Sequence, residues 1–173
     1  MRRRILLIVF SCILLILSLV IFDRINARNA APMPVPSVSG GYYENGFTLR
    51  LTAPSNGSIY YTTDGSTPTA DSTLYQDGIP LENRSSEQNL YNSVQNVVTD
   101  WKNYTPDPQP VEKGTVIRAV FVNERDIASE ILTQTYFIGL QPPERGYTLS
   151  LVFEYDDLFG EDGIYVTGKE YDE

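Results

Sequence analysis

The chain has 173 residues and a formal net charge of −9, which is enough for one ordinary domain with short appendages. The charge is uneven, because the sequence after residue 31 has eight basic and 21 acidic residues, a net charge of −13. Such an acidic surface repels phosphate backbones and argues against nucleic acid as a partner. The chain has no histidine, so the most common general base and metal ligand is missing.

The single cysteine, Cys12, lies inside an apolar run, so one chain can form neither a disulfide nor a cysteine-based zinc site. Any catalysis would have to use carboxylate, lysine or tyrosine side chains. The sequence has no paired-carboxylate motif and no glycine-rich phosphate loop. We therefore expect no catalytic residue, no cofactor-binding residue and no metal ligand in this chain.

Residues 1–24 have the pattern of a membrane anchor. Three arginines precede 18 apolar or small residues from Ile5 to Phe22, which at helical rise span about 27 Å. The arginine cluster predicts a cytoplasmic N-terminus and an extracytoplasmic remainder. The run is longer than the core of a cleaved signal peptide, so we favour an uncleaved anchor that binds membrane lipid and makes a single pass of the cell membrane. A cleaved signal peptide and lipidation of Cys12 are the alternatives.

Residues 25–37 include three prolines within five residues. Proline cannot continue a helix or pair within a central strand. This composition predicts a short, extended tether of the polyproline type between the anchor and the next domain.

Alternation of apolar and polar residues with a period of two predicts β-strands from about residue 38 to residue 138. Pairs that end in glycine punctuate the region at short intervals and predict turns. Short strands with regular turns are typical of an antiparallel β-sandwich of immunoglobulin or fibronectin type, so the expected fold class is mainly β, preceded by one transmembrane helix. The pattern is carried by Phe47, Leu49, Leu51, Ile59, Tyr61, Thr63, Val116, Ala119, Ile131, Thr133, Thr135 and Phe137.

The stretch SIYYTTDGSTPT, residues 58–69, leads an aromatic strand into an Asp-Gly pair. This pair predicts a tight turn, because glycine accepts a positive φ, and Pro68 forces the chain out of the sheet. A phosphoryl-acceptor aspartate is the alternative, but it would need a neighbouring carboxylate for a metal ion. We expect instead that hydrogen bonds to local backbone amides hold the corner, made by Asp64, Ser66, Thr67 and Thr69.

Four motifs in this region resemble the chitobiase/β-hexosaminidase C-terminal-type domain. They are a Tyr-Tyr-Thr-x-Asp-Gly-Ser-x-Pro-Thr element, a Ser-x-x-Tyr element, an Ile-Arg-Ala strand and a closing Thr-x-Thr-Tyr, at residues 60–69, 72–75, 117–119 and 133–136. The resemblance covers about residues 36–138. It implies a small β-sandwich that is appended to other proteins and is not itself catalytic.

An insert at residues 82–113 interrupts the resemblance. Its apolar residues fall on one helical face, and Ser85 with Gln88 could form a capping box. The stripe could dock a partner, but we favour packing against the chain's own sandwich, with Trp101 as the main buried group. The members of the stripe are Leu90, Tyr91, Val94, Val97, Val98 and Trp101.

The last segment, residues 139–173, is predicted to form a strand over 147–155, a turn or short helical corner over 156–162, and a second strand over 163–168 that hairpins back. Two strands cannot bury themselves and need a further sheet. An acidic cluster here suggests calcium, but its spacing fails the EF-hand loop and a solvated turn is expected. The cluster comprises Glu154, Asp156, Asp157, Glu161 and Asp162.

This segment also resembles the start of CotH-type spore-coat kinases, in which a Ser-Leu-Val strand precedes Asp-Asp-Leu-Phe-Gly and Gly-Ile-Tyr-Val. Here these motifs are residues 150–152, 156–160 and 163–166. The family often has Thr-Asp-Pro where this chain has Phe153, Glu154 and Tyr155. The resemblance implies ATP-dependent phosphoryl transfer by a domain whose catalytic residues lie downstream. No catalytic position is carried over to this chain, which we expect to be an N-terminal fragment.

The expected function is that of a membrane-anchored, extracytoplasmic accessory module of a CotH-like protein, without activity of its own. Its partners would be membrane lipid and a downstream kinase domain. The alternative is a carbohydrate-binding module that meets a cell-surface glycan or protein, suggested by twelve tyrosines. A flat, exposed row of aromatic rings would favour sugar binding, whereas buried rings would indicate sheet packing.

Overall fold

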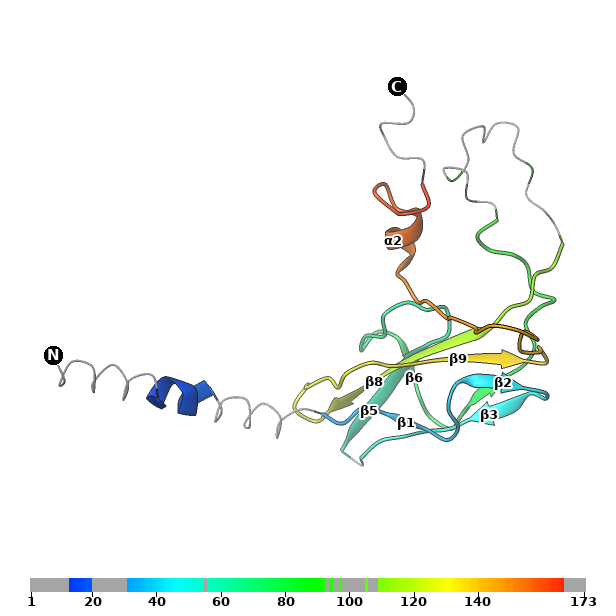
Figure 1. Ribbon diagram of the computed structural model, residues 1–173. Helices are drawn as coiled ribbons and strands as arrows, with labels where there is room; N and C mark the ends of the chain where they lie inside the picture. Colours follow the sequence, from blue (N-terminus) through cyan, green and yellow to red (C-terminus); the bar gives the residue numbers. More distant parts are fainter. Residues whose placement is uncertain are drawn as a thin grey trace, which may run out of the picture.

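The computed structural model describes residues 13–19, 31–54, 56–92, 94, 97, 105 and 109–166. The regular structure described between residues 31 and 140 consists mainly of β-strands (Figure 1). The prediction of a mainly β fold is confirmed. The elements are β1 (Val35–Pro36), β2 (Gly41–Tyr43), β3 (Phe47–Leu49), β4 (Leu51–Thr52), β5 (Gly57–Thr62), β6 (Thr73–Leu74), β7 (Ile79–Leu81), β8 (Thr115–Asn123), β9 (Leu132–Ile138) and α2 (Tyr155–Phe159).

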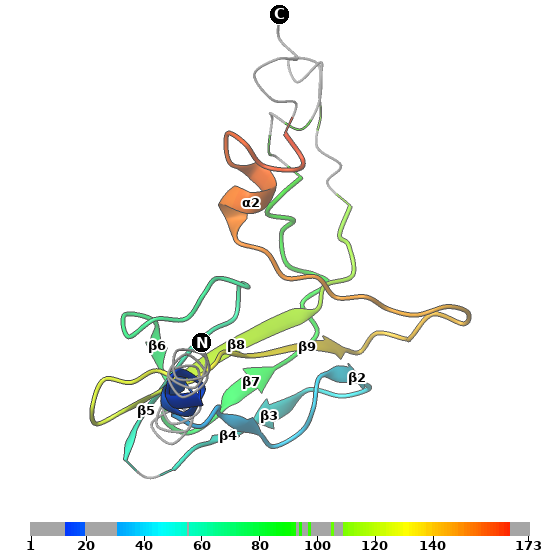
Figure 2. The same cartoon turned by 60° about the vertical axis from the view of Figure 1, so that its left-hand side comes forward.

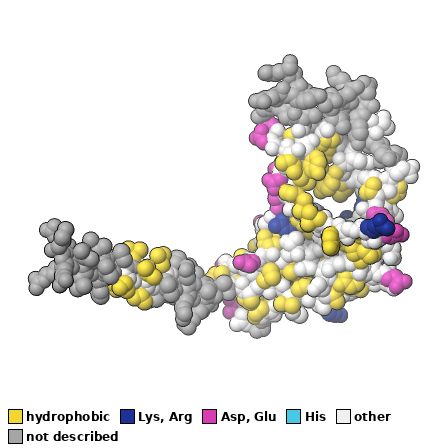
Figure 3. All heavy atoms as spheres, in the orientation of Figure 1, with side chains coloured by type: hydrophobic (Ala, Val, Ile, Leu, Met, Phe, Trp, Pro, Cys, Tyr) yellow, Lys and Arg dark blue, Asp and Glu magenta, His cyan; other side chains and the backbone are white. Residues whose placement is uncertain are grey.

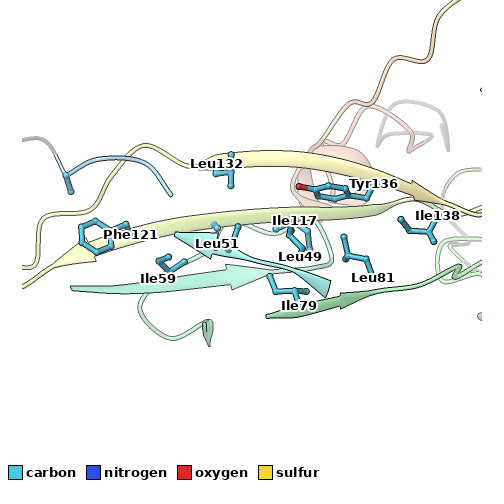
Figure 4. Close-up of a cluster of buried hydrophobic side chains, with 12 residues drawn as sticks. Leu49, Leu51, Ile59, Ile79, Leu81, Ile117, Phe121, Leu132, Tyr136 and Ile138 are labelled. Carbon is cyan, nitrogen blue, oxygen red and sulfur yellow. The ribbon is translucent and has the colours of Figure 1, made fainter. Parts of the chain in front are cut away.

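Five strands form the main sheet, in the order β2-β9-β8-β5-β6. Strands β3 and β7 pair with each other, and β1 pairs with β4. Leu49, Leu51, Ile79 and Leu81 from β3, β4 and β7 lie against side chains of the main sheet (Figure 4). These strands therefore form a second layer. The pairing of β5, β8 and β9 is antiparallel as predicted, but β2 runs parallel to β9.

The parallel pair departs from the predicted antiparallel sandwich. In this pair the two tyrosines of β2 lie on opposite faces of the sheet. Tyr42 stacks on Phe137, its register partner, with ring centroids 4.7 Å apart. Tyr43 packs toward the interior, 4.8 Å from the ring of Phe47. This register packs one partly buried tyrosine ring on each side of the sheet edge.

The hydrophobic core fills the space between the two layers (Figure 4). Alternate residues supply it because side chains along a strand point to opposite faces. On β9 the core face is that of Leu132, Tyr136 and Ile138, whereas the predicted set from Ile131 to Phe137 lies on the opposite face. The clustered side chains include Leu49, Leu51, Ile59, Ile79, Leu81, Ile117, Ala119, Phe121, Leu132, Tyr136 and Ile138.

Tyr136 is the largest fully buried side chain. Its hydroxyl donates a hydrogen bond to the carbonyl oxygen of Val38 at 2.9 Å, so the one polar atom of the ring is satisfied. Burial raises the pKa of Tyr136 to about 12. The hydroxyl therefore stays protonated and ties the start of the domain to strand β9.

Part of the predicted tether packs into the sandwich. The two residues of β1 pair with β4, and Ala31 and Pro34 are buried. Such a short strand at the edge of a layer is a place where proline is tolerated. The tether therefore contributes an edge to the domain from residue 31 onward.

The predicted membrane span at residues 5–22 is described only in part. Residues 13–19 are helical and exposed, and the rest of the span lies outside the described residues. Within the part of the chain that the structure describes, no helix is both long enough and apolar enough to cross a bilayer.

Replacing Leu49 with alanine tests the two-layer core. The side chain is fully buried between the layers, so we expect Leu49→Ala to lower the free energy of unfolding by about 2–5 kcal/mol through lost burial and a cavity. Urea denaturation followed by circular dichroism measures the change. Val35→Ala is the control, because Val35 is 60% exposed and should cost less than about 0.5 kcal/mol. Equal losses for the two variants would contradict the assigned core.

Candidate functional site

The Asp-Gly turn after β5 is held by its own side chains. Gly65 has a φ of +89°, a conformation that glycine adopts without a steric penalty. Oδ1 of Asp64 accepts hydrogen bonds from the backbone N–H and the hydroxyl of Ser66, at 3.0 and 2.6 Å. The Ser66 hydroxyl lowers the pKa of the Asp64 carboxyl. Asp64 thus holds the corner, as the sequence predicted.

Thr67 departs from the prediction that its hydroxyl bonds local backbone amides. Its hydroxyl lies between the guanidinium of Arg118, 3.0 Å away, and the carboxylate of Glu154, to which it donates a hydrogen bond. Arg118 belongs to the middle of β8, next to β5 in the main sheet. The turn is therefore connected to a residue of the C-terminal segment that is 87 positions away in the sequence.

Arg118 is the centre of this network. Its Nη1 donates to the carbonyl oxygen of Gly65 at 2.9 Å, to Thr67 and to Glu154 at 2.9 Å. The side chain of Arg118 is only 17% exposed to solvent, whereas that of Glu154 is 45% exposed. A charge that is mostly removed from water requires a charged or polar partner. Glu154 and the turn supply these partners to Nη1, whereas Nε is buried without a hydrogen-bond partner among the described residues.

Residues 148–154 cross the outer face of the main sheet, the face opposite the core. The hydroxyl groups of Tyr42 and Thr148 are 2.7 Å apart, as are those of Thr135 and Ser150. Val152 lies beside Gly65, because a Cβ atom added to Gly65 would be 3.6 Å from Cγ1 of Val152. Together with Glu154, every second residue of this segment touches the sheet, and Figure 2 shows the segment leading from the end of β9 toward α2.

The predicted strand over residues 147–155 is thus extended but unpaired. The alternation is correct, since even-numbered residues face the sheet, yet side chains rather than a backbone ladder hold the segment. The chain then enters α2, where Glu154 and Asp157 form a reciprocal capping box that satisfies backbone donors at the helix start. The short helical corner predicted here is confirmed.

The prediction of a second strand over residues 163–168 is wrong for residues 163–166, the part of it that the structure describes. Residues 161–166 form turns, because the N–H groups of Ile164 and Tyr165 donate to the carbonyl oxygens of Asp157 and Leu158 at 3.0 Å. These bonds satisfy carbonyl groups at the end of α2. Residues 167 and 168 lie outside the described residues.

The first part of the insert is not the predicted helix. Asn83 accepts a hydrogen bond from the N–H of Ser85 at 2.8 Å, which replaces helical capping by a local turn. Lys113 closes the base of the insert by donating to the carbonyl oxygens of Glu87 and Val111, at 2.8 and 3.1 Å. Residues 82–92 contain no helix, and Trp101 lies outside the described residues.

A hollow of about 430 Å³ lies between the turn at Asp64, the base of the insert and the start of β8. It is lined in part by Tyr91 and Lys113, but the ammonium group of Lys113 is already engaged with backbone carbonyls. Among the described residues, no group of three or more acidic or cysteine side chains lies close enough to hold a metal ion.

The tyrosines of the sandwich face mostly inward. Tyr43, Tyr61 and Tyr75 pack against the core, and Tyr136 is buried within it. Exposed aromatic rings gather instead where the insert meets the C-terminal segment, with the centroids of Tyr91 and Phe159 5.3 Å apart. The described part of the sandwich therefore lacks the flat aromatic row that stacking on a sugar would require.

Sequence reasoning missed the pairing of Arg118 with Glu154. The signal for a partner was an arginine in the middle of an otherwise apolar strand, TVIRAVFVN. A charge in such a strand requires a counter-charge, but its identity depends on the path of residues 148–154. Alternation of apolar and polar residues does not determine that path. It predicts which face of a strand a side chain lies on, but not which segment packs against that face.

The sequence model of the chitobiase/beta-hexosaminidase C-terminal domain matches residues 38–133, more than half of the chain. The chain belongs to this family. The matched region begins just after β1 and extends into β9. It contains the Asp-Gly turn and Arg118. Comparisons with curated proteins and with solved structures find no match.

Within this chitobiase/beta-hexosaminidase C-terminal domain, the outer face of the main sheet is the candidate functional site. It is where a segment outside the matched region, residues 148–154, contacts the domain. Its chemistry is that of an interaction surface: one partly buried cation, hydroxyl groups and an acidic anchor. The arrangement can position a neighbouring segment.

Replacing Arg118 with leucine should loosen residues 148–154. Partly exposed ion pairs contribute roughly 0.2–1 kcal/mol, so we expect chymotrypsin to cleave next to Tyr147 and Phe153 about twofold to fivefold faster in Arg118→Leu, as read by mass spectrometry. Arg50→Leu is the matched control, because Arg50 pairs with Asp77 at 3.5 Å and is 64% exposed. Unchanged cleavage in Arg118→Leu would contradict the anchor.

Acidification should also release the segment. The Thr67 hydroxyl, and then Arg118, lower the pKa of the Glu154 carboxyl in the docked state. The ionised carboxylate therefore stabilises docking at pH values above the ordinary pKa of glutamate. This stabilisation is lost as the pH falls through the lowered pKa. We expect the NMR amide shifts of Ser150 and Val152 to move toward random-coil values in acid. Glu154→Gln should show this state already at neutral pH. Shifts in Glu154→Gln that match the unmodified chain at neutral pH would contradict the mechanism.

Proposed function

We propose that the chain is a membrane-tethered, extracytoplasmic β-sandwich module without catalytic activity of its own, and that it positions a domain of CotH type through residues 139–173. The observation that carries the proposal is the path of residues 148–154, which are fixed to the outer face of the sheet at Arg118. A segment fixed in this way gives whatever is joined to it a defined orientation.

The CotH-like motif at residues 156–160 supports this assignment by its place in the fold. It coincides with most of α2, which has no buried residue and stands away from the sandwich (Figure 2). A helix whose side chains all remain accessible contributes little to the core of its own domain. This is the situation expected of an element that belongs to a neighbouring domain.

Membrane tethering is supported by the sequence of residues 1–24. The apolar run has the length of a spanning helix, and three arginines precede it. By the positive-inside rule this pattern supports a location of the sandwich outside the cytoplasm. Membrane lipid is then the first partner, and the kinase-like domain is the second. The acidic sandwich fits neither nucleic acid nor an anionic lipid surface.

The carbohydrate-binding alternative has less support. The sandwich tyrosines that suggested it pack against or within the core, and the outer face of the sheet is crossed by residues 148–154. A sugar would have to displace this segment in order to reach the sheet.

Tethering is tested by fractionating bacterial cells that express the full chain with a C-terminal tag. We expect the protein to remain with membranes through an alkaline wash and the tag to be digested by protease added to spheroplasts. Arginine at the centre of a spanning helix costs about 2.5–3.5 kcal/mol, so the double variant Leu14→Arg/Leu17→Arg should leave the membrane fraction. Val35→Arg, on an exposed residue of the sandwich, should remain in it.

The same preparation tests the absence of catalysis. Incubation of the purified full chain with ATP should give no phosphate release and no phosphorylation above a buffer blank, since the sequence contains no phosphate loop and no magnesium-binding pair. Phosphate transfer by the chain would overturn the proposed accessory role, and a tag protected in intact spheroplasts would overturn the proposed location.

A further inference from the structure

Residues 147–153 carry exposed apolar side chains at their odd-numbered positions, which alternate with the residues that bond the sheet. Two of them, Leu151 and Phe153, also line a hollow beside Tyr91. Tyr147, Leu149, Leu151 and Phe153, called the apolar row, retain 101, 79, 64 and 42% of their exposure. Figure 3 shows hydrophobic side chains exposed above the sandwich, close to acidic ones. Four apolar side chains in succession along one edge are more than the scattered exposure of a normal surface and indicate an interaction site.

The backbone of the same segment is also available. Within the described chain, residues 147–153 belong to no strand pair, while their sheet-facing side chains hold them extended. An extended segment without a ladder presents unpaired N–H and C=O groups. Such a segment is a template to which a further strand can add, with backbone hydrogen bonds and alternate side-chain contacts.

The charge next to the apolar row determines what kind of strand fits. A hollow of about 750 Å³ begins at Phe153 and is lined by carboxylates of α2 and the turn after it, together with Ile164. The four carboxylates belong to Asp156, Asp157, Glu161 and Asp162. Residues 147–166 contain no lysine or arginine, so the surface complements a cation that reaches the hollow from the end of the row.

We propose that residues 147–153 bind a β-strand of another protein domain. The strand has alternating apolar side chains that cover the row, and a lysine or arginine at the end that lies in the acidic hollow beside α2. A second copy of this chain that paired in the antiparallel direction would bring its own Arg145 toward this hollow, so self-association is tested separately below. The inference goes beyond the proposed function, since it holds for a strand of any domain with this chemistry.

The test uses a synthetic peptide of alternating valine and threonine with lysine at both ends, and a matched peptide with glutamate at both ends. Fluorescence anisotropy with the full chain measures both affinities. We expect the lysine peptide to bind at least about tenfold more tightly than the glutamate peptide, a difference of about 1.4 kcal/mol. Methylation of alternate peptide nitrogens should remove binding, because it blocks the backbone pairing.

Two variants separate the parts of the surface. Leu149→Ser/Leu151→Ser should weaken binding of the lysine peptide at least about tenfold, while Val35→Ser, a control on an exposed valine elsewhere on the domain, should not. Asp156→Asn/Asp162→Asn should reduce the preference for lysine over glutamate. Circular dichroism and thermal unfolding confirm that each variant is folded.

Three results would overturn the inference. Equal affinity for the lysine and glutamate peptides would remove the role of charge, and undiminished binding of the methylated peptide would remove strand pairing. Sedimentation that shows a dimer of the chain, dissociated by Leu149→Ser/Leu151→Ser, would assign the row to self-association instead. None of these outcomes depends on membrane tethering or on the absence of ATP chemistry, so failure here is distinct from failure of the proposed function.

Discussion

The arrangement of the C-terminal segment depends on one charged side chain in the middle of the main sheet. Arg118 is largely removed from water, and the free energy of burying a cation is recovered only if oxygen acceptors surround it. Those acceptors come from the carbonyl of Gly65 in the Asp-Gly turn and from the carboxylate of Glu154. A single guanidinium thus brings together a turn of the family domain and a segment that lies outside the region matched to that family.

Two different kinds of interaction therefore hold the molecule together. The sandwich is stabilised by burial of aliphatic and aromatic side chains between two layers, which is insensitive to pH and salt over ordinary ranges. The C-terminal segment is held to the sheet by hydroxyl contacts and one ion pair, which are weaker and depend on pH. The segment can therefore detach or rearrange while the sandwich stays folded, and this suits an element that meets a partner.

The sequence predicted the features that depend on local periodicity and turn chemistry. Alternation identified Leu49, Leu51 and Ile59, all of which are buried, and the Asp-Gly pair identified the corner at Asp64. Alternation does not determine which strand a segment pairs with. It therefore missed the separation of β3 from β4, which pair with different strands, and the parallel register of β2 on β9.

The C-terminal segment shows the same limit more clearly. Its period of two is real, but the even-numbered residues contact the sheet through side chains and the backbone remains unpaired. The prediction for the first part of the insert, residues 82–92, was wrong for a different reason. The side chain of Asn83 accepts a hydrogen bond from the N–H of Ser85, and a turn replaces the first turn of the expected helix. Local hydrogen bonding of this kind competes with helix formation and is not visible in the apolar pattern.

Disulfide trapping gives the most direct test of the docked segment. The side-chain oxygens of Thr135 and Ser150 lie 2.7 Å apart, so the double variant Thr135→Cys/Ser150→Cys, in a Cys12→Ser background, has the geometry for a disulfide. We expect mild oxidation to cross-link this pair rapidly and completely, while Thr135→Cys/Leu149→Cys, whose second position faces away from the sheet, should remain reduced. Equal cross-linking of the two pairs, or of neither, would contradict a segment held in a fixed register on the outer face.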